Sequence, residues 1–295
     1  MCRYACLRGK VLRVSIGGIL TAMVTPFDAD GALNRDAAVR LMHHLLENGS
    51  DGVVLAGSTG EGATLSDEEK YTLWELGVSE CGDATVIAGT GTYDTHHTVE
   101  LTQRADAIGV DAMLVVTPYY VRPNRRGIRA HFEAVAAATD KPIVAYNIPS
   151  RTGTDMPNDL LAELAEIENV VAVKQARYED MAPIEGMDLL AGNDDVLGKV
   201  LDLGGTGGIL VASHLVGREM RRLIDEPERR RELEDGLRDL YKALTVTTNP
   251  IPVKAALNMV GHDVGGLRLP LMEASDEEKA VIREALERHN LLATV

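Results

Sequence analysis

The chain has few aromatic residues and few cysteines. Of its 295 residues, 4% are Phe, Trp or Tyr, and three are cysteine, at Cys2, Cys6 and Cys81. The core must therefore be built mainly from aliphatic side chains. Because the cysteines are odd in number and lack the spacing of a metal site, they argue against a disulfide scaffold and fit a reducing compartment.

Long apolar runs and an excess of positive charge are also missing. No run approaches the ~18 apolar residues of a membrane-spanning helix, and the basic start of the chain lacks the continuous apolar stretch of a signal peptide. Lys and Arg number 30 against 45 Asp and Glu, so the net charge is −15, whereas nucleic acids and anionic membranes bind basic surfaces. We expect a cytoplasmic protein with no nucleic-acid partner and no membrane partner.

What is present is a regular alternation of strand-like and helix-like segments. Short apolar segments predict eight strands, at Ile19–Val24, Gly52–Leu55, Thr85–Ala88, Ala112–Val116, Ile143–Tyr146, Val170–Lys174, Leu189–Ala191 and Gly208–Val211. Helical patterns lie between them, at Arg35–Glu47, Asp67–Ser79, Thr98–Ala107, Gly127–Ala138, Asp159–Leu164 and Asp195–Leu203. Only the link around Ala182–Gly186 is too short for a clear helix. The alternation predicts parallel strands with right-handed crossovers, and eight repeats favour a (β/α)8 TIM barrel over an open doubly wound sheet.

The strand pattern stops after about Arg218, and three helical segments follow, at Asp225–Leu244, Ile251–Met259 and Asp276–Leu292. We therefore divide the chain into three parts. Residues 1–15 are an extension that we expect to be disordered, residues 16–222 form the barrel with its site, and residues 223–295 form a C-terminal helical region.

Lys174 closes the sixth predicted strand. The preceding run is rich in Val, which is typical of a strand buried on both faces. A lysine there loses solvation, which lowers its pKa, and a neutral lysine can attack a carbonyl to form a Schiff base. Taken alone, the residue favours the alternative of a side chain that reaches solvent at the strand end.

Three other strand ends carry reactive side chains, and such ends meet at one mouth of a (β/α)8 barrel. The second strand runs into the turn Gly57–Gly62, whose backbone N–H groups can bind a carboxylate, although an ordinary βα turn has a similar composition. Tyr120 follows the fourth strand, Tyr146 ends the fifth, and Arg151 follows it. A tyrosine can move protons beside a Schiff base, and an arginine can hold a carboxylate. Their convergence with Lys174 favours chemistry over packing.

The sequence offers little for a metal. The pairs His43–His44 and His96–His97 have no acidic partner at metal-ligand spacing. Asp194 and Asp195 are better explained as a cap of the helix that begins there. We expect neither a metal nor an organic cofactor.

Several strings together resemble the dihydrodipicolinate synthase / N-acetylneuraminate lyase family, and they occur in the family's order. They are Leu20–Phe27, Gly57–Glu61, Thr117–Pro123, Tyr146–Gly153, Lys174, Gly192–Asp195 and Asn249–Lys254. The resemblance spans about Ile16 to Leu292. It implies a class I aldolase-like enzyme on a (β/α)8 barrel with a helical C-terminal part, assembled as a homotetramer.

The resemblance also implies catalytic roles for residues of this chain. Lys174 would form the Schiff base with pyruvate, and Tyr146 would transfer protons. Ser58 and a tyrosine hydroxyl would relay those protons to solvent. Tyr120 would reach the site of a neighbouring subunit, which would make the dimer the catalytic unit.

Substrate binding is implied in the same way. The backbone at Thr59 would hold the pyruvate carboxylate, Gly192 and Ile209 would line the pyruvate site, and Arg151 would bind a carboxylate of the second substrate. Members of the family with Arg-Thr-Gly after the catalytic tyrosine condense pyruvate with L-aspartate 4-semialdehyde to 4-hydroxy-tetrahydrodipicolinate, in lysine and diaminopimelate biosynthesis. The sialic acid lyases carry no Arg there. Arg151 therefore favours the condensation with L-aspartate 4-semialdehyde, which is also classed as a lyase reaction.

Two residues depart from this pattern, since Gln175 resembles the lyases and Arg177 follows close behind it. Two alternatives therefore stay open: another Schiff-base pyruvate aldolase that acts on a sugar acid or 2-oxo acid, and a non-catalytic pyruvate-binding sensor.

Lysine-inhibited members of the family carry Asn, Glu and His where this chain has Tyr93, His97 and Asp67. We therefore expect weak inhibition by lysine, or none.

Overall fold

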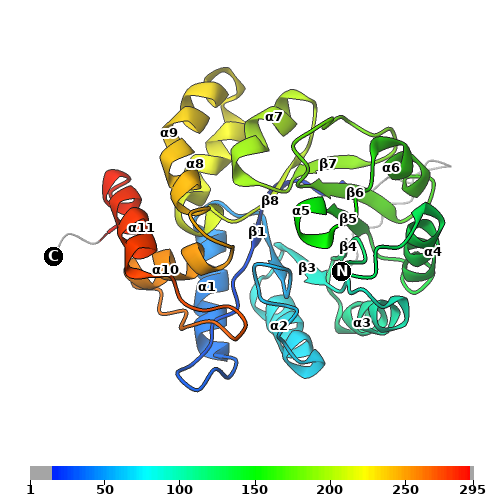
Figure 1. The fold of residues 1–295 in the computed structure, drawn as a ribbon, viewed down its shortest axis with the longest axis horizontal. Coiled ribbons are helices and arrows are strands. Elements are labelled where there is room, and N and C mark those ends of the chain that lie inside the picture. Colours follow the sequence, from blue (N-terminus) through cyan, green and yellow to red (C-terminus); the bar gives the residue numbers. More distant parts are fainter. Residues whose placement is uncertain (1–14, 293–295) are drawn as a thin grey trace.

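The computed structural model describes residues 15–292. The expected N-terminal extension, with Cys2 and Cys6, lies outside the described residues apart from Ser15. Eight parallel strands close into a barrel in sequence order, which confirms the predicted fold (Figure 1). The strands are β1 (Gly18–Ala22), β2 (Gly52–Leu55), β3 (Thr85–Gly89), β4 (Ala112–Val116), β5 (Ile143–Asn147), β6 (Val170–Gln175), β7 (Asp188–Ala191) and β8 (Gly207–Leu210).

Helices surround the strands and continue beyond them. They are α1 (Arg35–Glu47), α2 (Asp67–Glu80), α3 (Thr95–Ile108), α4 (Arg125–Ala136), α5 (Pro149–Thr152), α6 (Asn158–Leu164), α7 (Leu197–Asp202), α8 (Ser213–Asp225), α9 (Arg230–Ala243), α10 (Ile251–Met259) and α11 (Asp276–Arg288), with short 3₁₀ turns at Asp194–Val196 and Pro227–Arg229. Capping side chains mark the starts of α1, α2, α3, α4 and α11. At α2, for example, the Ser66 hydroxyl accepts from Glu69 N and the Glu69 carboxylate accepts from Ser66 N, which is a capping box.

Two buried layers line the two faces of the strands. Side chains that point outward pack beneath the helices, and side chains that point inward fill the barrel. The inward layer includes the aliphatic residues Leu20, Val54, Ile87, Leu114, Val144, Ala172, Leu190 and Ile209. Aliphatic side chains dominate this layer, and Tyr146 is its one aromatic member among the described residues, so the low aromatic content is no obstacle to the fold.

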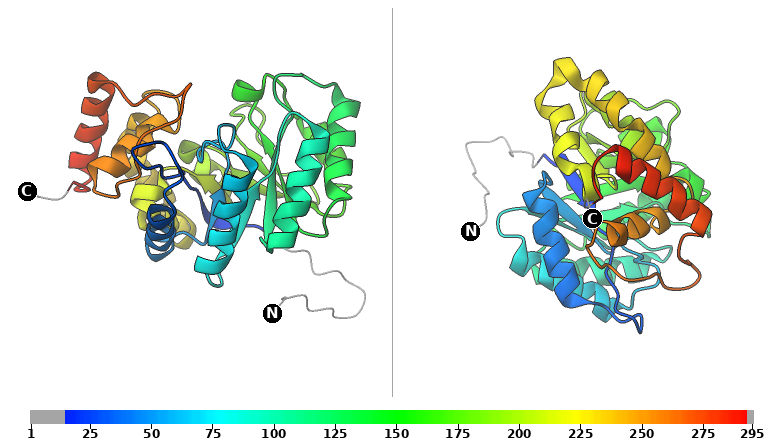
Figure 2. Two further views of the ribbon diagram at one scale, coloured as in Figure 1. Left: turned by 90° about the horizontal axis from the view of Figure 1, so that it is seen from below. Right: turned by 90° about the vertical axis from the view of Figure 1, so that its left-hand side faces the viewer.

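The C-terminal helices lie on one flank of the barrel. Helix α9 packs on α8, and α11 packs on α9 and α10. Helices α10 and α11, orange and red in Figure 2, lie on the side of α1 and away from α3 and α4. The C-terminal region therefore reaches the barrel beside its first and last strands.

Helix α8 is the main element that the sequence patterns missed. It contains a residue with non-helical dihedral angles, Val216, followed by Gly217, which interrupts the helical period. A Cβ at Gly217 would lie 2.3 Å from Asn48 O, so this position needs a glycine for close packing against the end of α1. The predicted domain boundary after residue 222 falls inside α8 and stays a prediction.

A smaller difference concerns the helix that follows α8. The helix expected over Asp225–Leu244 begins only at Arg230, because Pro227 lacks a backbone N–H and starts a separate 3₁₀ turn. The link before β7 contains no helix, as its length suggested, but an isolated bridge between Ile184 and Met187. Within residues 15–292, no helix is long and apolar enough to cross a membrane.

Candidate active site

Lys174 and Tyr146 lie side by side inside the mouth of the barrel. Lys174 follows Ala172 by two residues on β6, so both side chains point to the same face of the strand, the barrel interior. Strands β5 and β6 pair with Tyr146 opposite Lys174. The Lys174 Nζ lies 4.2 Å from the centroid of the Tyr146 ring.

Burial shapes the proton affinities of both groups. Only 5% of Lys174 is exposed, and desolvation lowers its pKa to about 7, with Arg151 also lowering it and Asp194 raising it. A large fraction of the amine is therefore neutral near neutral pH. Burial raises the pKa of Tyr146 to about 12 against the effects of Arg151 and of hydrogen bonding with Ser58, so the phenol keeps its proton.

A cavity of about 610 Å³ opens in front of these residues. It is lined by most of the residues singled out from the sequence: Ser58, Thr59, Tyr146, Arg151, Lys174 and Gly192. Helix α9 supplies part of the outer wall through Glu234, Arg238 and Tyr241. The C-terminal helical region therefore contributes to the site directly.

Two residues from the sequence-based set lie elsewhere. Ile209 is fully buried in the inward layer of the barrel, and Val211, two residues further along, lines the cavity in its place. Tyr120 is 88% exposed, with a φ of +68°, and does not line the cavity of its own chain. The roles expected for both residues stay predictions.

The turn after β2 presents Ser58 and Thr59 to the cavity. Gly62 N donates to Gly57 O at 3.0 Å and Glu61 N donates to Ser58 O at 3.2 Å, which closes the turn. A Cβ at position 62 would lie 2.1 Å from Ala56 O, so the tight turn requires a glycine there.

Arg151 is carried by α5, a single helical turn that the sequence patterns did not predict. Pro149 starts this turn with its fixed φ, and Gly153 ends it with a left-handed φ of +67°. The guanidinium donates from Nη2 to Asn249 O at 2.9 Å.

Asn249 is a site residue that the sequence did not single out individually. Its Nδ2 donates to Thr59 Oγ1 at 2.9 Å, while its carbonyl accepts from Arg151, so it joins the two predicted substrate-binding residues. The only signal was its place in the string Asn249–Lys254. Because that string lies beyond the barrel, strand-end reasoning gave Asn249 no role.

The interpretation of Asp194 as a cap of its own helix is wrong. The first residue before that 3₁₀ turn is Asn193, which makes no side-chain cap. Asp194 Oδ1 instead accepts from Val211 N at 2.8 Å and Ala212 N at 3.0 Å, so it ties the end of β7 to the start of α8. Burial raises the pKa of Asp194 to about 6 despite these two hydrogen bonds.

Gly192 lets the ends of β6 and β7 approach each other. A Cβ there would lie 2.8 Å from both Ala176 N and Ala176 Cβ.

Gln175 is buried and does not line the cavity. Its Oε1 accepts from Asn147 Nδ2 and from Arg177 N, both at 3.1 Å. The lyase-like residue therefore has a structural position away from the cavity.

A second cavity of about 560 Å³ lies behind the Ser58–Tyr146 wall. It brings together Tyr93, His97 and Asp67, which the sequence associated with an effector site. Asp67 is already paired, since it accepts from Lys70 Nζ at 2.9 Å and is hydrogen-bonded to His97 Nε2 at 2.8 Å. Burial raises the pKa of Asp67, but the hydrogen bonds and charges of Lys70 and His97 lower it by more. The pKa of Asp67 therefore lies below its ordinary value.

No metal centre is found in the described part of the chain. Among residues 15–292, no group of three or more His, Cys, Asp or Glu side chains could hold a metal ion.

Comparisons with known proteins agree with this geometry. The model of the Dihydrodipicolinate synthetase family matches residues 15–289. The chain is 44% identical over 290 residues to the 4-hydroxy-tetrahydrodipicolinate synthase of Moorella thermoacetica, covering 94% of this chain and 99% of that protein.

Solved structures give the same result. The lysine-bound dihydrodipicolinate synthase of Cyanidioschyzon merolae matches with a TM-score of 0.90 and 39% identity, covering 94% of this chain and 99% of that one. The chloride-inhibited dihydrodipicolinate synthase of Acinetobacter baumannii, complexed with pyruvate, matches with a TM-score of 0.91 and 32% identity, covering 94% of this chain and all (100%) of that one. The chain therefore belongs to the dihydrodipicolinate synthetase family.

Proposed function

We propose that this chain condenses pyruvate with L-aspartate 4-semialdehyde to give 4-hydroxy-tetrahydrodipicolinate. The observation that carries the proposal is a buried lysine with a pKa near 7, beside a protonated tyrosine, in a cavity that also contains Arg151. The names of relatives at about this chain's full length support it.

The reaction begins at Lys174. Its neutral Nζ attacks the keto carbon of pyruvate, water leaves, and loss of a methyl proton gives an enamine. The enamine carbon attacks the aldehyde of the second substrate, and hydrolysis frees the lysine and an open-chain product. The amino group of that product attacks its keto carbon, and loss of water closes the ring. Tyr146 and Ser58, which are hydrogen-bonded to each other, supply and remove the protons.

Two groups orient the substrates. The N–H groups of the Ser58–Thr59 turn hold the pyruvate carboxylate. Arg151, at the rim on α5, holds the carboxylate of the semialdehyde. We also propose that the protein is a homotetramer that works in the cytoplasm, and that Tyr120 completes the proton relay of a second copy.

The test is a coupled assay with pyruvate and L-aspartate 4-semialdehyde, run beside pyruvate release from sialic acid and from 2-keto-3-deoxygluconate. We expect turnover of the semialdehyde and no pyruvate release from either sugar acid. The reverse pattern would make the chain a sugar-acid aldolase, and binding of pyruvate without turnover would make it a sensor. The buried position of Gln175, outside the cavity, removes the main sequence argument for the first alternative.

A further inference from the structure

The turn that carries Ser58 and Thr59 is held by residues of the C-terminal region. Glu61 lies in this turn with a φ of +53°. Its carboxylate is buried, with Oε1 accepting from Lys254 Nζ at 2.7 Å and Oε2 accepting from Arg268 N at 3.0 Å. Both partners are about 200 residues away in sequence, on α10 and on the loop that follows it.

Lys254 is buried, and three neighbouring groups contact its amine: the Glu61 carboxylate, Gly266 O and the Phe27 ring. It is 1% exposed, and its Nζ also donates to Gly266 O at 2.5 Å and lies 4.2 Å from the centroid of the Phe27 ring. A buried charge pair with these additional contacts permits little movement of either side chain. The pair therefore fixes the backbone at residue 61 against α10.

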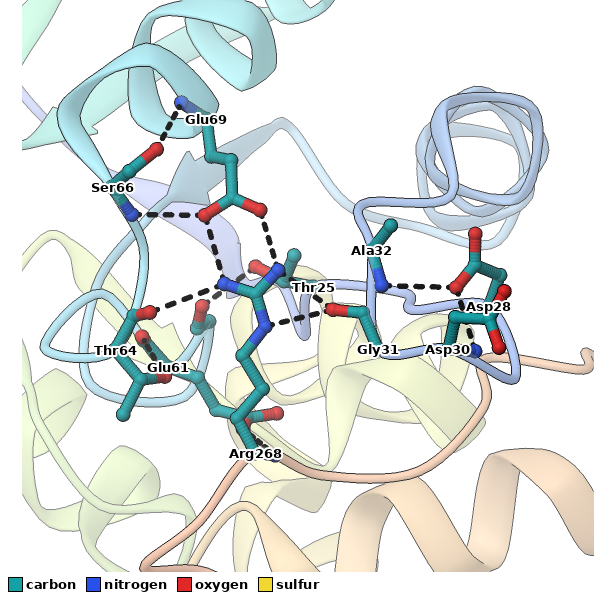
Figure 3. Close-up of polar contacts among 11 residues, drawn as sticks. Thr25, Asp28, Asp30, Gly31, Ala32, Glu61, Thr64, Ser66, Glu69 and Arg268 are labelled. Carbon is teal, nitrogen blue, oxygen red and sulfur yellow. Dashed lines mark hydrogen bonds and ion pairs between the residues drawn. The ribbon is translucent and has the colours of Figure 1, made fainter.

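Arg268 clamps the chain just after the turn (Figure 3). Its guanidinium lies between the Glu69 carboxylate at the start of α2 and Gly31 O in the loop before α1, and it donates to Thr64 O at 3.1 Å. Figure 3 also shows the Glu61 side chain reaching the main chain of Arg268, whose N donates to the Glu61 carboxylate. The segment from residue 61 to residue 69 is therefore held at both ends.

The orientation of one peptide group depends on this anchoring. Glu61 N donates to Ser58 O, and Ser58 O belongs to the same planar peptide unit as Thr59 N. The position of residue 61 therefore sets the direction of the N–H that, in the proposed function, binds the pyruvate carboxylate.

We propose that the Glu61–Lys254 ion pair is a positioning device for pyruvate binding. The pair touches no substrate and acts through the Ser58–Thr59 peptide. Neither Glu61 nor Lys254 contacts Arg151, which is held by Asn249 O, so we expect loss of the pair to affect pyruvate more than the second substrate. This inference rests on the proposed function, since it needs pyruvate at the turn.

The test removes both charges together, because a single substitution leaves a buried charge without its partner. In the double variant Glu61→Gln/Lys254→Met, the new amide keeps an acceptor for Arg268 N. We expect the pyruvate concentration for half-maximal borohydride trapping at Lys174 to rise by about 10- to 100-fold. Trapping at saturating pyruvate and the KM for the semialdehyde should stay close to the wild-type values.

The matched control is Arg221→Met. Arg221 also joins a late helix to the barrel through an ion pair, with Asp51, but at the opposite end of β2 from the turn. A purely structural role for ion pairs of this kind predicts similar changes in both proteins. We expect the pyruvate concentration for half-maximal trapping to be unchanged in the control.

An unchanged half-maximal concentration in the double variant, or an equal rise in the control, would overturn the inference. If the double variant does not fold, Glu61→Asp provides the measurement, because it keeps the charge and draws residue 61 toward Lys254. Its half-maximal concentration should also rise, and an unchanged value would count against the inference. Absence of trapping in the wild-type protein would instead overturn the proposed function.

Discussion

At the scale of single residues, the site depends on a lysine whose surroundings favour its neutral form. Lys174 is buried among interior side chains that are mostly aliphatic, with the Tyr146 ring beside it, and the nearby charge of Arg151 also disfavours the ammonium form. Only the partly paired Asp194 opposes these effects. The sequence predicted the buried strand, but the balance of charges depends on residues far apart in the chain.

The lowered pKa of Lys174 predicts the pH dependence of the first step. Below the pKa of about 7 the amine is protonated and cannot attack a carbonyl. The rate of borohydride trapping at limiting pyruvate should therefore rise with pH to about 7 and then level off. A rate that keeps rising toward the ordinary lysine pKa of 10.5 would show that the amine is not desolvated.

Arg151→Ala should impair use of the semialdehyde. A hydrogen bond to a charged group is worth about 1.5–3 kcal/mol, so kcat/KM for the semialdehyde should fall by about 10- to 150-fold. Trapping of pyruvate should survive. Because Arg151 lowers the pKa of Lys174, the midpoint of the trapping profile should also move to higher pH. Wild-type kinetics in this variant would exclude Arg151 from the site.

At the scale of elements, the sequence was most informative where a segment has one clear period. The bounds of α1, β2, β4 and α10 agree with the predicted ranges, because their ends coincide with caps, glycines or prolines. It was least informative for α5 and α8. Helix α5 is too short for a period, and Val216 and Gly217 interrupt the period of α8.

The short helix α5 offers a test of this explanation. Gly153→Ala places a Cβ on a residue with a φ of +67°, which costs about 1–2 kcal/mol. The variant should have a lower unfolding temperature and a higher KM for the semialdehyde, because α5 carries Arg151. Gly153→Asn is the control, since Asn tolerates the left-handed conformation. Equal losses in both variants would mean that the dihedral angle is not the cause.

At the scale of the whole molecule, the cavity combines strand ends with the C-terminal region. Strand-end reasoning found Lys174, Tyr146 and Arg151, because these belong to the barrel. It gave no role to Asn249 or Tyr241, because no local pattern places the C-terminal region over the mouth. Such contacts depend on packing between segments that the sequence does not connect.

Tyr120 should act in the site of a second copy. It is exposed and does not line its own cavity, as expected of a residue that completes a neighbouring site. Inactive Tyr120→Phe and inactive Lys174→Ala subunits should regain part of the activity when mixed, because one site in each hybrid has both groups. No recovery in hybrids verified by mass spectrometry would remove this role.

Lysine should inhibit the enzyme weakly or not at all. Two acidic residues line the second cavity, and both are already paired: Asp67 with Lys70 and His97, and Glu61 with Lys254. An effector ammonium would have to displace Lys70 or Lys254 or remain without a carboxylate, and burying an unpaired charge costs several kcal/mol. The measurement is synthase activity across a range of lysine concentrations. Strong inhibition at low millimolar lysine would show that the second cavity binds the effector through other contacts.

The central claim is that Lys174 forms a Schiff base with pyruvate. Borohydride reduction in the presence of pyruvate, followed by peptide mass spectrometry, tests it most directly. We predict one pyruvate-derived adduct on the peptide that contains Lys174, and none in Lys174→Ala. An adduct on another lysine, or no adduct in the folded wild-type protein, would contradict the account.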